Sequence, residues 1–531
     1  MTVAPGHHRL FADFCAADPA VRPFYPWMAA EAGDQQRPAL PAHWPELVAL
    51  IGAQNPSPAA APVLEALSQG AGTVVTGQQV GLFGGPLFTP FKAATAIARA
   101  RQATAEGHPH AAIFWLASED HDFAEINRVT FPAGRELAKL IYTSAPEAPV
   151  PVGGVALDDS ILPLLERAGE LLGFSEAAEE MTRAYRPGRT FAQAFGEFYA
   201  KVFSAQGLLI LDASSRAVHR LGAPVLRAAM ERADELHAAL LERNRALDAA
   251  GYHAQVAVGS QSSLLFLIDE ESGARLALKR MAPTAAEPGG LWQTAGDGGR
   301  KSFSTEELAG ILDSEPERIS PSALLRPVFQ DFLLSSSLVV GGPAEIAYFA
   351  QNSVLYQRIL GRTTPSAPRF SASLIEPSIG EILRKHELTL EQVFSRDSAG
   401  LAQLLADRRL APEAKAKLAA AGSALDSELS SLLEWMHAQD AGLGRSAETA
   451  ASKMRYQMNR LRHLAANFQL QREAALGRHA ETIHQALYPT GALQERVHGA
   501  AYYFARYGLE LAETLCEQAG ISCQGHTALW L

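Results

Sequence analysis

Four short apolar segments, each followed by a glycine or an acidic residue and then by a helical pattern, constrain the fold of this chain more than any other feature. They lie at residues 73–75, 111–116, 207–211 and 336–340. Strands that alternate with helices in this way are typical of a parallel sheet covered by helices. We therefore predict an α/β protein with a Rossmann-like parallel-sheet core, whose ligands bind beyond the carboxyl ends of the strands.

Other stretches divide the rest of the chain. Residues 262–281 alternate apolar with polar side chains and turn at 271–273, which predicts an antiparallel hairpin within an insertion at about 250–320. The glycine- and proline-rich residues 282–299 predict a mobile loop in the same insertion. We expect a core over 1–377, a helical arm over 378–488, and a C-terminal helical segment over 489–531 that packs back on the core.

Apolar residues beyond Pro377 recur every seven residues, in two interleaved rows. Such rows predict helices that pack as a coiled coil, and their interruption at Gly442 and Gly444 predicts an antiparallel hairpin of two helices. A hairpin of this length buries its seam fully only against another body, so we expect a homodimer through the arm, with an intramolecular bundle as the alternative. The rows consist of Leu418, Leu425 and Leu432, of Leu429, Met436 and Leu443, and, after the glycines, of Met454, Leu461 and Phe468 with Met458 and Ala465.

The charge and the cysteine content exclude several classes of protein. Among 531 residues, 46 Lys and Arg stand against 57 Asp and Glu, and the formal net charge of −11 repels nucleic acid and anionic membrane surfaces. Three cysteines, no signal-peptide pattern and no run of about 18 apolar residues predict a cytoplasmic protein without a membrane span. The group Cys516, Cys523 and His526 matches no common zinc spacing, so we predict no metal site there.

The segment TGQQVGLFGGPLFTPFK, residues 76–92, follows the first predicted strand and opens a helix. Its glycines allow the backbone to pass close to a ligand, and exposed amides at the start of a helix attract a phosphate or a carboxylate. The spacing matches neither the Walker nor the dinucleotide fingerprint, and a glycine-rich turn without a ligand is the alternative. The candidates are Gly77, Gln78, Gln79, Gly84, Gly85, Thr89 and Lys92, of which the last two share one face of the helix.

Four ionisable residues, Glu119, Asp120, His121 and Asp122, follow the second predicted strand, and Asn127 lies five residues further on. Carboxylates packed this closely repel one another unless they face solvent or a cation holds them, such as a metal, an ammonium group or a lysine. A histidine among them can act as an oriented general base. A solvated turn is the alternative, but the position at the end of a strand favours a site.

The fourth predicted strand ends at Gly341 and Gly342, which we expect to bind the cofactor, and leads into a helix that carries Glu345, Tyr348 and Gln351. Their spacing of three places these polar residues along one stripe of the helix, where they can line a ligand site. An ordinary amphipathic helix has the same pattern, so both interpretations stay open.

These blocks resemble a known family, the cysteine ligases of bacillithiol biosynthesis usually called BshC. The resemblance implies a Rossmann-like core related to class I aminoacyl-tRNA synthetases and nucleotidylyltransferases, and a coiled coil through which the family dimerises. It also implies a reaction, which joins the carboxyl group of L-cysteine to the amino group of glucosaminyl malate in the last step toward bacillithiol. The matching blocks are residues 76–92, FWLASEDHDFAEIN at 114–127, LLRPVFQDFLL at 324–334, VVGGPAEIAYFAQ at 339–351 and LYPTGALQERV at 487–497.

An amine attacks a carboxylate only after the carboxylate carries a better leaving group than hydroxide. ATP or another nucleotide is therefore expected as the cofactor, with Mg²⁺ as the one metal that could accompany it. The synthetase HxGH histidines are absent, and Thr89 and Lys92 stand in that region, so adenylate and acyl phosphate intermediates both stay open. A ligase acting on another amine and a non-catalytic dimeric scaffold are alternatives, because no residue here recognises a thiol or a malate uniquely.

The resemblance and this chemistry together assign hypothetical roles. Residues 77–92 bind the anionic part of the donor, with Lys92 compensating developing charge. Residues 119–122 receive the ammonium group of cysteine or of the sugar, with His121 or Asp122 as base. The stripe of Glu345, Tyr348 and Gln351 binds substrate hydroxyls or carboxylates.

Overall fold

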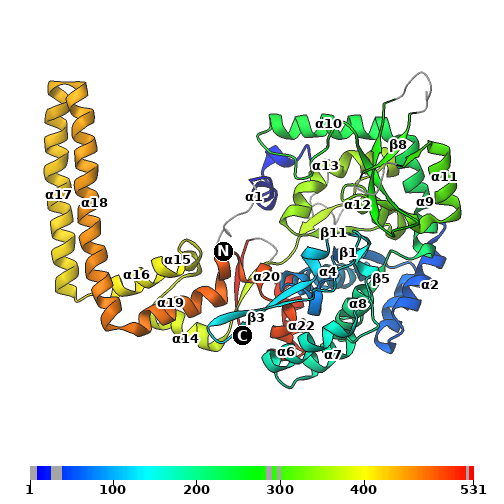
Figure 1. Ribbon diagram of the computed structural model, residues 1–531, viewed down its shortest axis with the longest axis horizontal. Coiled ribbons are helices and arrows are strands. Elements are labelled where there is room, and N and C mark those ends of the chain that lie inside the picture. The colour runs from blue at the N-terminus through cyan, green and yellow to red at the C-terminus, as the bar shows by residue number, and fades with distance from the viewer. Residues whose placement is uncertain (1–8, 26–38, 283–289, 296–300, 522–524) are drawn as a thin grey trace.

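The structure, a computed structural model, describes residues 9–25, 39–282, 290–295, 301–521 and 525–531. An α/β body contains most of the chain, and a long helical hairpin projects from it (Figure 1). No helix within the described ranges is long and apolar enough to cross a membrane.

Five parallel strands form the central sheet, in the order β12 Ser366–Pro368, β11 Leu338–Gly341, β1 Gly72–Gln78, β2 His110–Leu116 and β5 Leu209–Asp212. The predicted Rossmann-like fold is therefore confirmed, and four of the strands lie where the apolar segments predicted them. Strand β12 was not predicted because its three residues, Ser-Ala-Pro, carry no strand pattern. From β1 the chain extends the sheet first toward β5 and later toward β12, so the strand order reverses between β1 and β11.

Alternate residues of the strands enter two separate hydrophobic cores. Val74 and Phe114 belong to one core and Val75 and Trp115 to the other, so the sheet is buried on both faces. The first core is covered by α4 Phe88–Ala105, α8 Phe191–Val202 and α22 Leu511–Ile521, and the second by α2 Trp44–Gln54, α9 Arg216–Glu231, α12 Arg326–Leu334 and α13 Pro343–Leu360. Further helices of the body are α1 Arg9–Cys15, α3 Ala61–Ser68, α6 Leu162–Leu172, α7 Glu176–Ala184 and α10 Ala233–Ala249.

The insertion forms a second, antiparallel sheet, with strands in the order β10 Ile319–Pro321, β6 Ser262–Ile268, β7 Arg275–Arg280, β8 Trp292–Ala295 and β9 Ser302–Phe303. Ile268 pairs with Arg275 across the predicted turn, which confirms the hairpin. The predicted loop 282–299 contains strand β8, and its residues 283–289 and 296–299 lie outside the described residues. Helix α11 Thr305–Ser314 leads from β9 toward β10.

Two long helices, α17 Pro412–Gln439 and α18 Ala441–Arg472, form the projecting hairpin (Figure 1). The break between them lies at Asp440 and not at the glycines, because the Asp440 carboxylate accepts the amides of Gly442 and Leu443 at 2.7 and 2.9 Å and begins α18. Gly444 instead permits close packing, since a Cβ there would lie 2.1 Å from the His437 ring. The base of the arm consists of α14 Pro377–Lys385, α15 Leu390–Phe394, α16 Ser398–Arg409 and α19 Ala474–Leu487.

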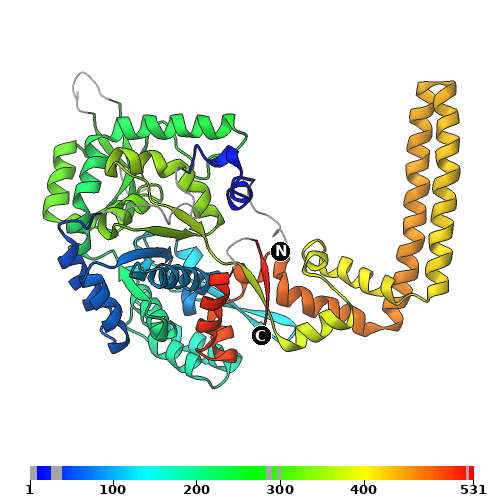
Figure 2. The same cartoon turned by 180° about the vertical axis from the view of Figure 1, so that it is seen from behind.

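The C-terminal segment returns to the body through α20 Gln494–Val497, α21 Ala500–Tyr507, α22 and β14 Thr527–Trp530. Strand β14 pairs in parallel with β13 Ala372–Ile375, and α22 lies along α4 (Figure 2). The Leu87 amide donates to the His498 carbonyl at 2.8 Å, and the Ala500 amide donates to the Gly85 carbonyl at 2.9 Å. The segment between α20 and α21 thus holds the glycine-rich loop that follows β1.

His498 is expected to make stability depend on pH. Its ring lies 2.9 Å from the Tyr503 hydroxyl and 3.0 Å from the Gln485 carbonyl, and burial lowers its pKa from 6.5 to about 4. Between these values the unfolded chain binds a proton that the folded chain does not, so the free energy of unfolding falls as the pH drops. We expect His498→Gln to reduce the loss of unfolding free energy between about pH 7 and about pH 5 by about 1–2 kcal/mol, measured by urea denaturation. An unchanged pH dependence would contradict this.

Candidate functional site

The glycine-rich residues that follow β1 are packed inside the protein. The Gly84 amide donates to the Tyr185 hydroxyl at 2.9 Å, and the Gly85 amide donates to the Leu82 carbonyl at 3.0 Å. A Cβ at Gly84, whose φ is +83°, would lie 2.7 Å from the Phe198 ring. The structure therefore corrects the prediction that Gly84 and Gly85 offer free amides to an anion, because the turn needs glycine for packing and already uses both amides.

Lys92 and Thr89 lie on α4, and both side chains are buried. The Lys92 ammonium donates to the Gly77 carbonyl and to Gln78 Oε1, each at 2.8 Å, and forms an ion pair with Glu345. Burial lowers the pKa of Lys92, although the charge of Glu345 opposes this. Since all three donors of the ammonium have acceptors, Lys92 can contact a ligand only by giving up one of them.

Glu345 connects Lys92 to the start of α13. Its carboxylate accepts the Gly342 amide at 2.8 Å and lies 3.9 Å from the Arg326 guanidinium. Arg326 also donates to the Tyr348 hydroxyl at 2.7 Å. Two cations and the start of a long helix therefore gather where the strand order reverses, which is the place where sheets of this kind bind anionic ligands.

Two predicted site residues, Gln351 and Asn127, serve the scaffold instead. The Gln351 amide donates to the Val256 carbonyl at 2.9 Å and accepts from the Val256 amide at 2.8 Å. Residues three apart on a helix are offset by about 60°, so Gln351 lies about 120° around α13 from Glu345. Asn127 donates to the Tyr142 carbonyl at 2.9 Å and holds the hairpin of β3 Arg128–Ala133 and β4 Glu136–Ile141. The structure thus removes both side chains from the predicted site.

The loops that follow β1 and β2 meet through Gln79. Its side-chain nitrogen donates to Asp120 Oδ2 at 2.8 Å and to Glu125 Oε2 at 2.7 Å. Glu125 lies on the short helix α5 Phe123–Ile126, and Asp122 accepts the Glu125 amide at 3.2 Å as the N-cap of that helix. The sequence hypothesis omitted Glu125, although it lies within one helical turn of Asp122, and Asp122 is a helix cap here.

Asp120 and Glu125 both accept from Gln79, but their pKa values are shifted in opposite directions. Burial by itself would raise the pKa of Asp120, but hydrogen bonds from Gln79 and the His121 amide and the charge of Arg275 lower it. Burial raises the pKa of Glu125, and the charges of Asp120 and Asp122 add to this effect. When two neighbouring carboxylates differ in pKa in this way, the one with the lower pKa can serve as a permanent charge and the other as a proton carrier.

Glu119 turns toward a buried histidine that sequence reasoning missed. His219 of α9 is fully buried, with Nε2 at 2.7 Å from Glu119 Oε1 and Nδ1 at 3.0 Å from the Ile319 carbonyl. Burial alone would lower the pKa of His219, but the charge of Glu119 and the hydrogen bonds raise it. Both ring nitrogens face acceptors, so the His219 ring links Glu119 to β10. This leaves Glu119 occupied within the chain.

The inserted sheet contributes a second missed residue, Arg275 of β7. Its guanidinium lies 3.3 Å from His121 Nδ1, donates to the Ser320 hydroxyl at 2.9 Å and donates to the Pro321 carbonyl at 2.8 Å. His121 therefore lies between the sheet edge and the insertion, with Asp120 Oδ1 3.6 Å from its Nδ1. No local pattern could reveal this contact, because the two residues come from separate parts of the chain.

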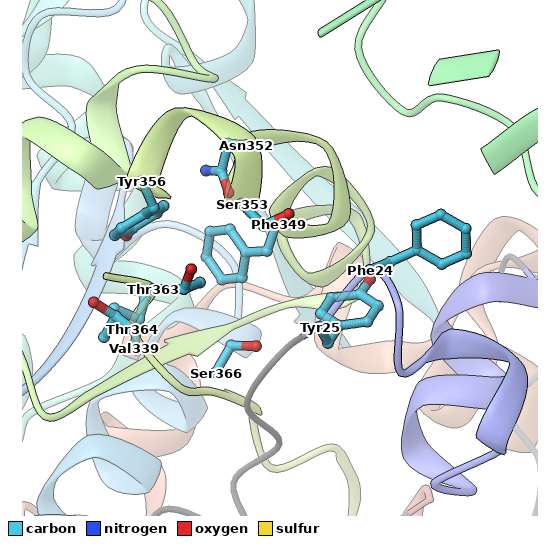
Figure 3. A pocket seen from close by; sticks show the side chains of 10 residues that line it. All are labelled: Phe24, Tyr25, Val339, Phe349, Asn352, Ser353, Tyr356, Thr363, Thr364 and Ser366. Atoms are coloured by element: carbon cyan, nitrogen blue, oxygen red, sulfur yellow. The ribbon is translucent and has the colours of Figure 1, made fainter. Parts of the chain in front are cut away.

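Two cavities of the described structure have none of these site residues in their lining. One, beside α13, is lined by Tyr25, Phe349 and Tyr356 among others (Figure 3), and its volume of about 20 Å³ is room for about one water molecule. Another, of about 340 Å³, lies between Leu383 of α14 and Trp530 of β14. Within the described ranges no group of three or more His, Cys, Asp or Glu side chains is arranged to hold a metal ion.

Comparisons with known proteins cover nearly the whole chain. Residues 3–370 match the family model described as the N-terminal Rossmann-like domain of bacillithiol biosynthesis BshC, and residues 372–530 match the C-terminal coiled-coil domain of the same family.

Individual relatives extend this similarity. Proteins named "Putative cysteine ligase BshC" from Koribacter versatilis and Solibacter usitatus are 39% and 32% identical to the chain, each over 99% of this chain and 98% of the relative. A protein of the same name from Geobacillus kaustophilus is 29% identical over 83% of this chain and 81% of its own length.

Replacing Lys92 is expected to destabilise the protein strongly. Lys92→Met removes the ammonium that pairs with the Glu345 carboxylate and donates to the Gly77 carbonyl, which should lower the free energy of unfolding by about 2–4 kcal/mol. Urea denaturation at neutral pH measures the change. Arg101→Met is the matched control, because Arg101 also lies on α4 but pairs with Glu513 at the surface, and its loss should be under about 1 kcal/mol. Equal losses for the two variants would contradict the role given to Lys92.

Proposed function

The chain belongs to the BshC family of bacillithiol biosynthesis, and from this premise we propose that it is a ligase that joins the carboxyl group of L-cysteine to the amino group of glucosaminyl malate. The observation that carries the proposal is the meeting of the loops after β1 and β2. There, Gln79 contacts Asp120 and Glu125, while its neighbour Gln78 contacts Lys92. An edge with a cationic end and an acidic end suits a reaction between an activated carboxyl group and an amine.

The cationic end would bind the anionic part of the activated donor. Lys92, Arg326 and the start of α13 offer two positive charges and a helix dipole, whereas the amides of Gly84 and Gly85 are already used. ATP or another nucleotide supplies the activation that a free carboxylate needs, through an adenylate or an acyl phosphate. When bound, its phosphates would compete with Glu345 for Lys92.

The acidic end would bind and deprotonate the amine. Asp120 stays ionised because its pKa is lowered, so it can hold an ammonium group. Glu125, whose pKa is raised, and His121 are the proton acceptors that remain, since Asp122 caps α5. General-base assistance of this kind contributes on the order of 10²–10⁴-fold.

Purified full-length protein, given L-cysteine, glucosaminyl malate and ATP, should form the amide, detected by mass spectrometry. We expect Asp120→Asn to lower kcat/KM for the amine on the order of 10²-fold or more. The asparagine amide lacks the negative charge that attracts an ammonium group, and its NH₂ group is a donor where the carboxylate only accepts. Glu513→Gln, at the surface beside α4, is the control and should change little.

Three other outcomes of this assay would change or overturn the proposal. Product with other amines as well would show a broader ligase, and binding without turnover would favour a non-catalytic scaffold. Full activity of Asp120→Asn would overturn the assignment of the amine to this end of the site.

We also propose that the arm forms a homodimer. The hairpin buries Leu429 and Met458 between α17 and α18 but leaves the neighbouring row exposed: Met454, Leu461 and Phe468 are 48%, 55% and 60% exposed. Charge is divided as well, since α18 carries six Lys and Arg with one Glu, whereas α17 carries four Asp and Glu with two Lys. A second copy could cover the apolar row and pair α18 with α17.

Leu461→Glu should convert a dimer to a monomer, because it places a charge in the apolar row that the partner would cover. Light scattering should give about half of the wild-type mass. Asn467→Glu, at an exposed polar position of the same helix, is the control and should remain dimeric. A monomeric wild-type protein, or a Leu461→Glu variant that stays dimeric, would contradict the proposal.

A further inference from the structure

A continuous chain of side-chain hydrogen bonds joins the two ends of the site. The Lys92 ammonium donates to Gln78 Oε1 at 2.8 Å, and Gln78 Nε2 donates to Gln79 Oε1 at 3.0 Å. Gln79 Nε2 then donates to Asp120 at 2.8 Å and to Glu125 at 2.7 Å. The Gln78–Gln79 pair thus connects the cation of one end to the carboxylates of the other.

The groups at the two ends dictate the direction of this chain. A lysine ammonium can only donate, and an ionised carboxylate can only accept. Gln79 must therefore present its NH₂ to Asp120 and its carbonyl to Gln78, and Gln78 must present its NH₂ to Gln79 and its carbonyl to Lys92. A flip of either amide would set two donors or two acceptors against each other, so both amides are locked in one orientation.

The hydrogen-bonded chain lies in a buried to half-buried environment, which strengthens the effect of each bond on the next. Lys92 is 3% exposed, and Gln78 and Gln79 are half-buried. In such an environment hydrogen bonds polarise their neighbours more strongly than they do in water. A change in charge at one end of the chain therefore alters how firmly the other end is held.

We propose that Gln78 and Gln79 are positioning residues that form a relay of fixed hydrogen-bond direction, through which an ammonium group bound at Asp120 and Glu125 strengthens anion binding at Lys92. The ammonium donates to the carboxylates and weakens their hold on the Gln79 amide. The Gln79 carbonyl then polarises Gln78 less, and the Gln78 carbonyl releases Lys92 more readily to an incoming anion. By linkage, the anion favours the ammonium to the same degree. The identity of the two ligands rests on the proposed function, whereas the relay does not.

A relay in series has a signature that simple attraction between the two ligands lacks. Opposite charges attract through space whether or not the amides are present. In a series chain, breaking either amide link removes the coupling, and breaking both removes no more than breaking one. Independent structural effects of the two residues would instead add.

The coupling can be measured by calorimetry on the full-length protein, with ATP as the anion and D-glucosamine as an amine that lacks a carboxylate. Saturating glucosamine should tighten ATP binding by about fivefold or more. Gln78→Leu, Gln79→Leu and the double variant should each reduce this factor to below about twofold. Gln102→Leu on α4, whose amide contacts exposed Glu106, is the matched control and should keep the wild-type factor. Wild-type coupling in either single variant, or losses that add in the double variant, would overturn the relay.

A second measurement needs no ligand and separates the relay from the proposed function. Glu345→Gln and Asp120→Asn alter the two ends, and their shifts in the thermal midpoint should deviate from additivity by about 2 °C or more in the wild-type background. In the Gln79→Leu background the shifts should add. If they behave so but neither ATP nor glucosamine binds, the relay stands and the proposed function fails. If the shifts add in both backgrounds while the protein makes product, the relay fails and the function stands.

Discussion

The buried ammonium of Lys92 is the interaction on which the arrangement of the sheet edge depends. With 3% of the residue exposed, the ammonium needs an acceptor for each of its N–H groups, because an unpaired charge away from water is costly. The acceptors come from the end of β1 and from Glu345 at the start of α13. These segments are distant in sequence and meet because β1 and β11 are neighbours in the sheet. Lys92 therefore fixes how β1, α4 and α13 come together where the strand order reverses.

The fold was predictable where local pattern and tertiary structure agree. The segments at 73–75 and 336–340 could be recognised as strands because an apolar run ends at glycine before a helical pattern. Strand β12 and the outer strands of the inserted sheet are too short to show a period. The hairpin turn was misplaced by two residues because Gly442 suggested a break, whereas the capping carboxylate of Asp440 sets the helix start.

The sequence could predict that the residues following two strands form the candidate site, but it could not predict the contacts that these residues make. Gln79 and Asp120 could be named because they follow strands whose carboxyl ends lie at one edge. His219 and Arg275 could not, because each reaches the acidic turn from an element about 100 or more residues away, and no periodicity encodes such contacts. The anion-binding role predicted for Gly84 was wrong for another reason. A glycine is required there by the positive φ and by the close packing against Phe198, and the sequence alone does not distinguish this requirement from anion binding.

The neutral amides at 78 and 79 explain how opposite charges coexist at this edge. If a flexible lysine and the carboxylates of Asp120 and Glu125 were adjacent, they would form an ion pair and occupy each other. Two glutamine side chains keep them apart while satisfying one donor of Lys92 and an acceptor on each carboxylate. A charged residue at either position would neutralise one end, and an apolar one would leave hydrogen-bonding groups unpaired. Two consecutive glutamines are therefore among the few choices that keep the cationic and the acidic ends both separate and connected.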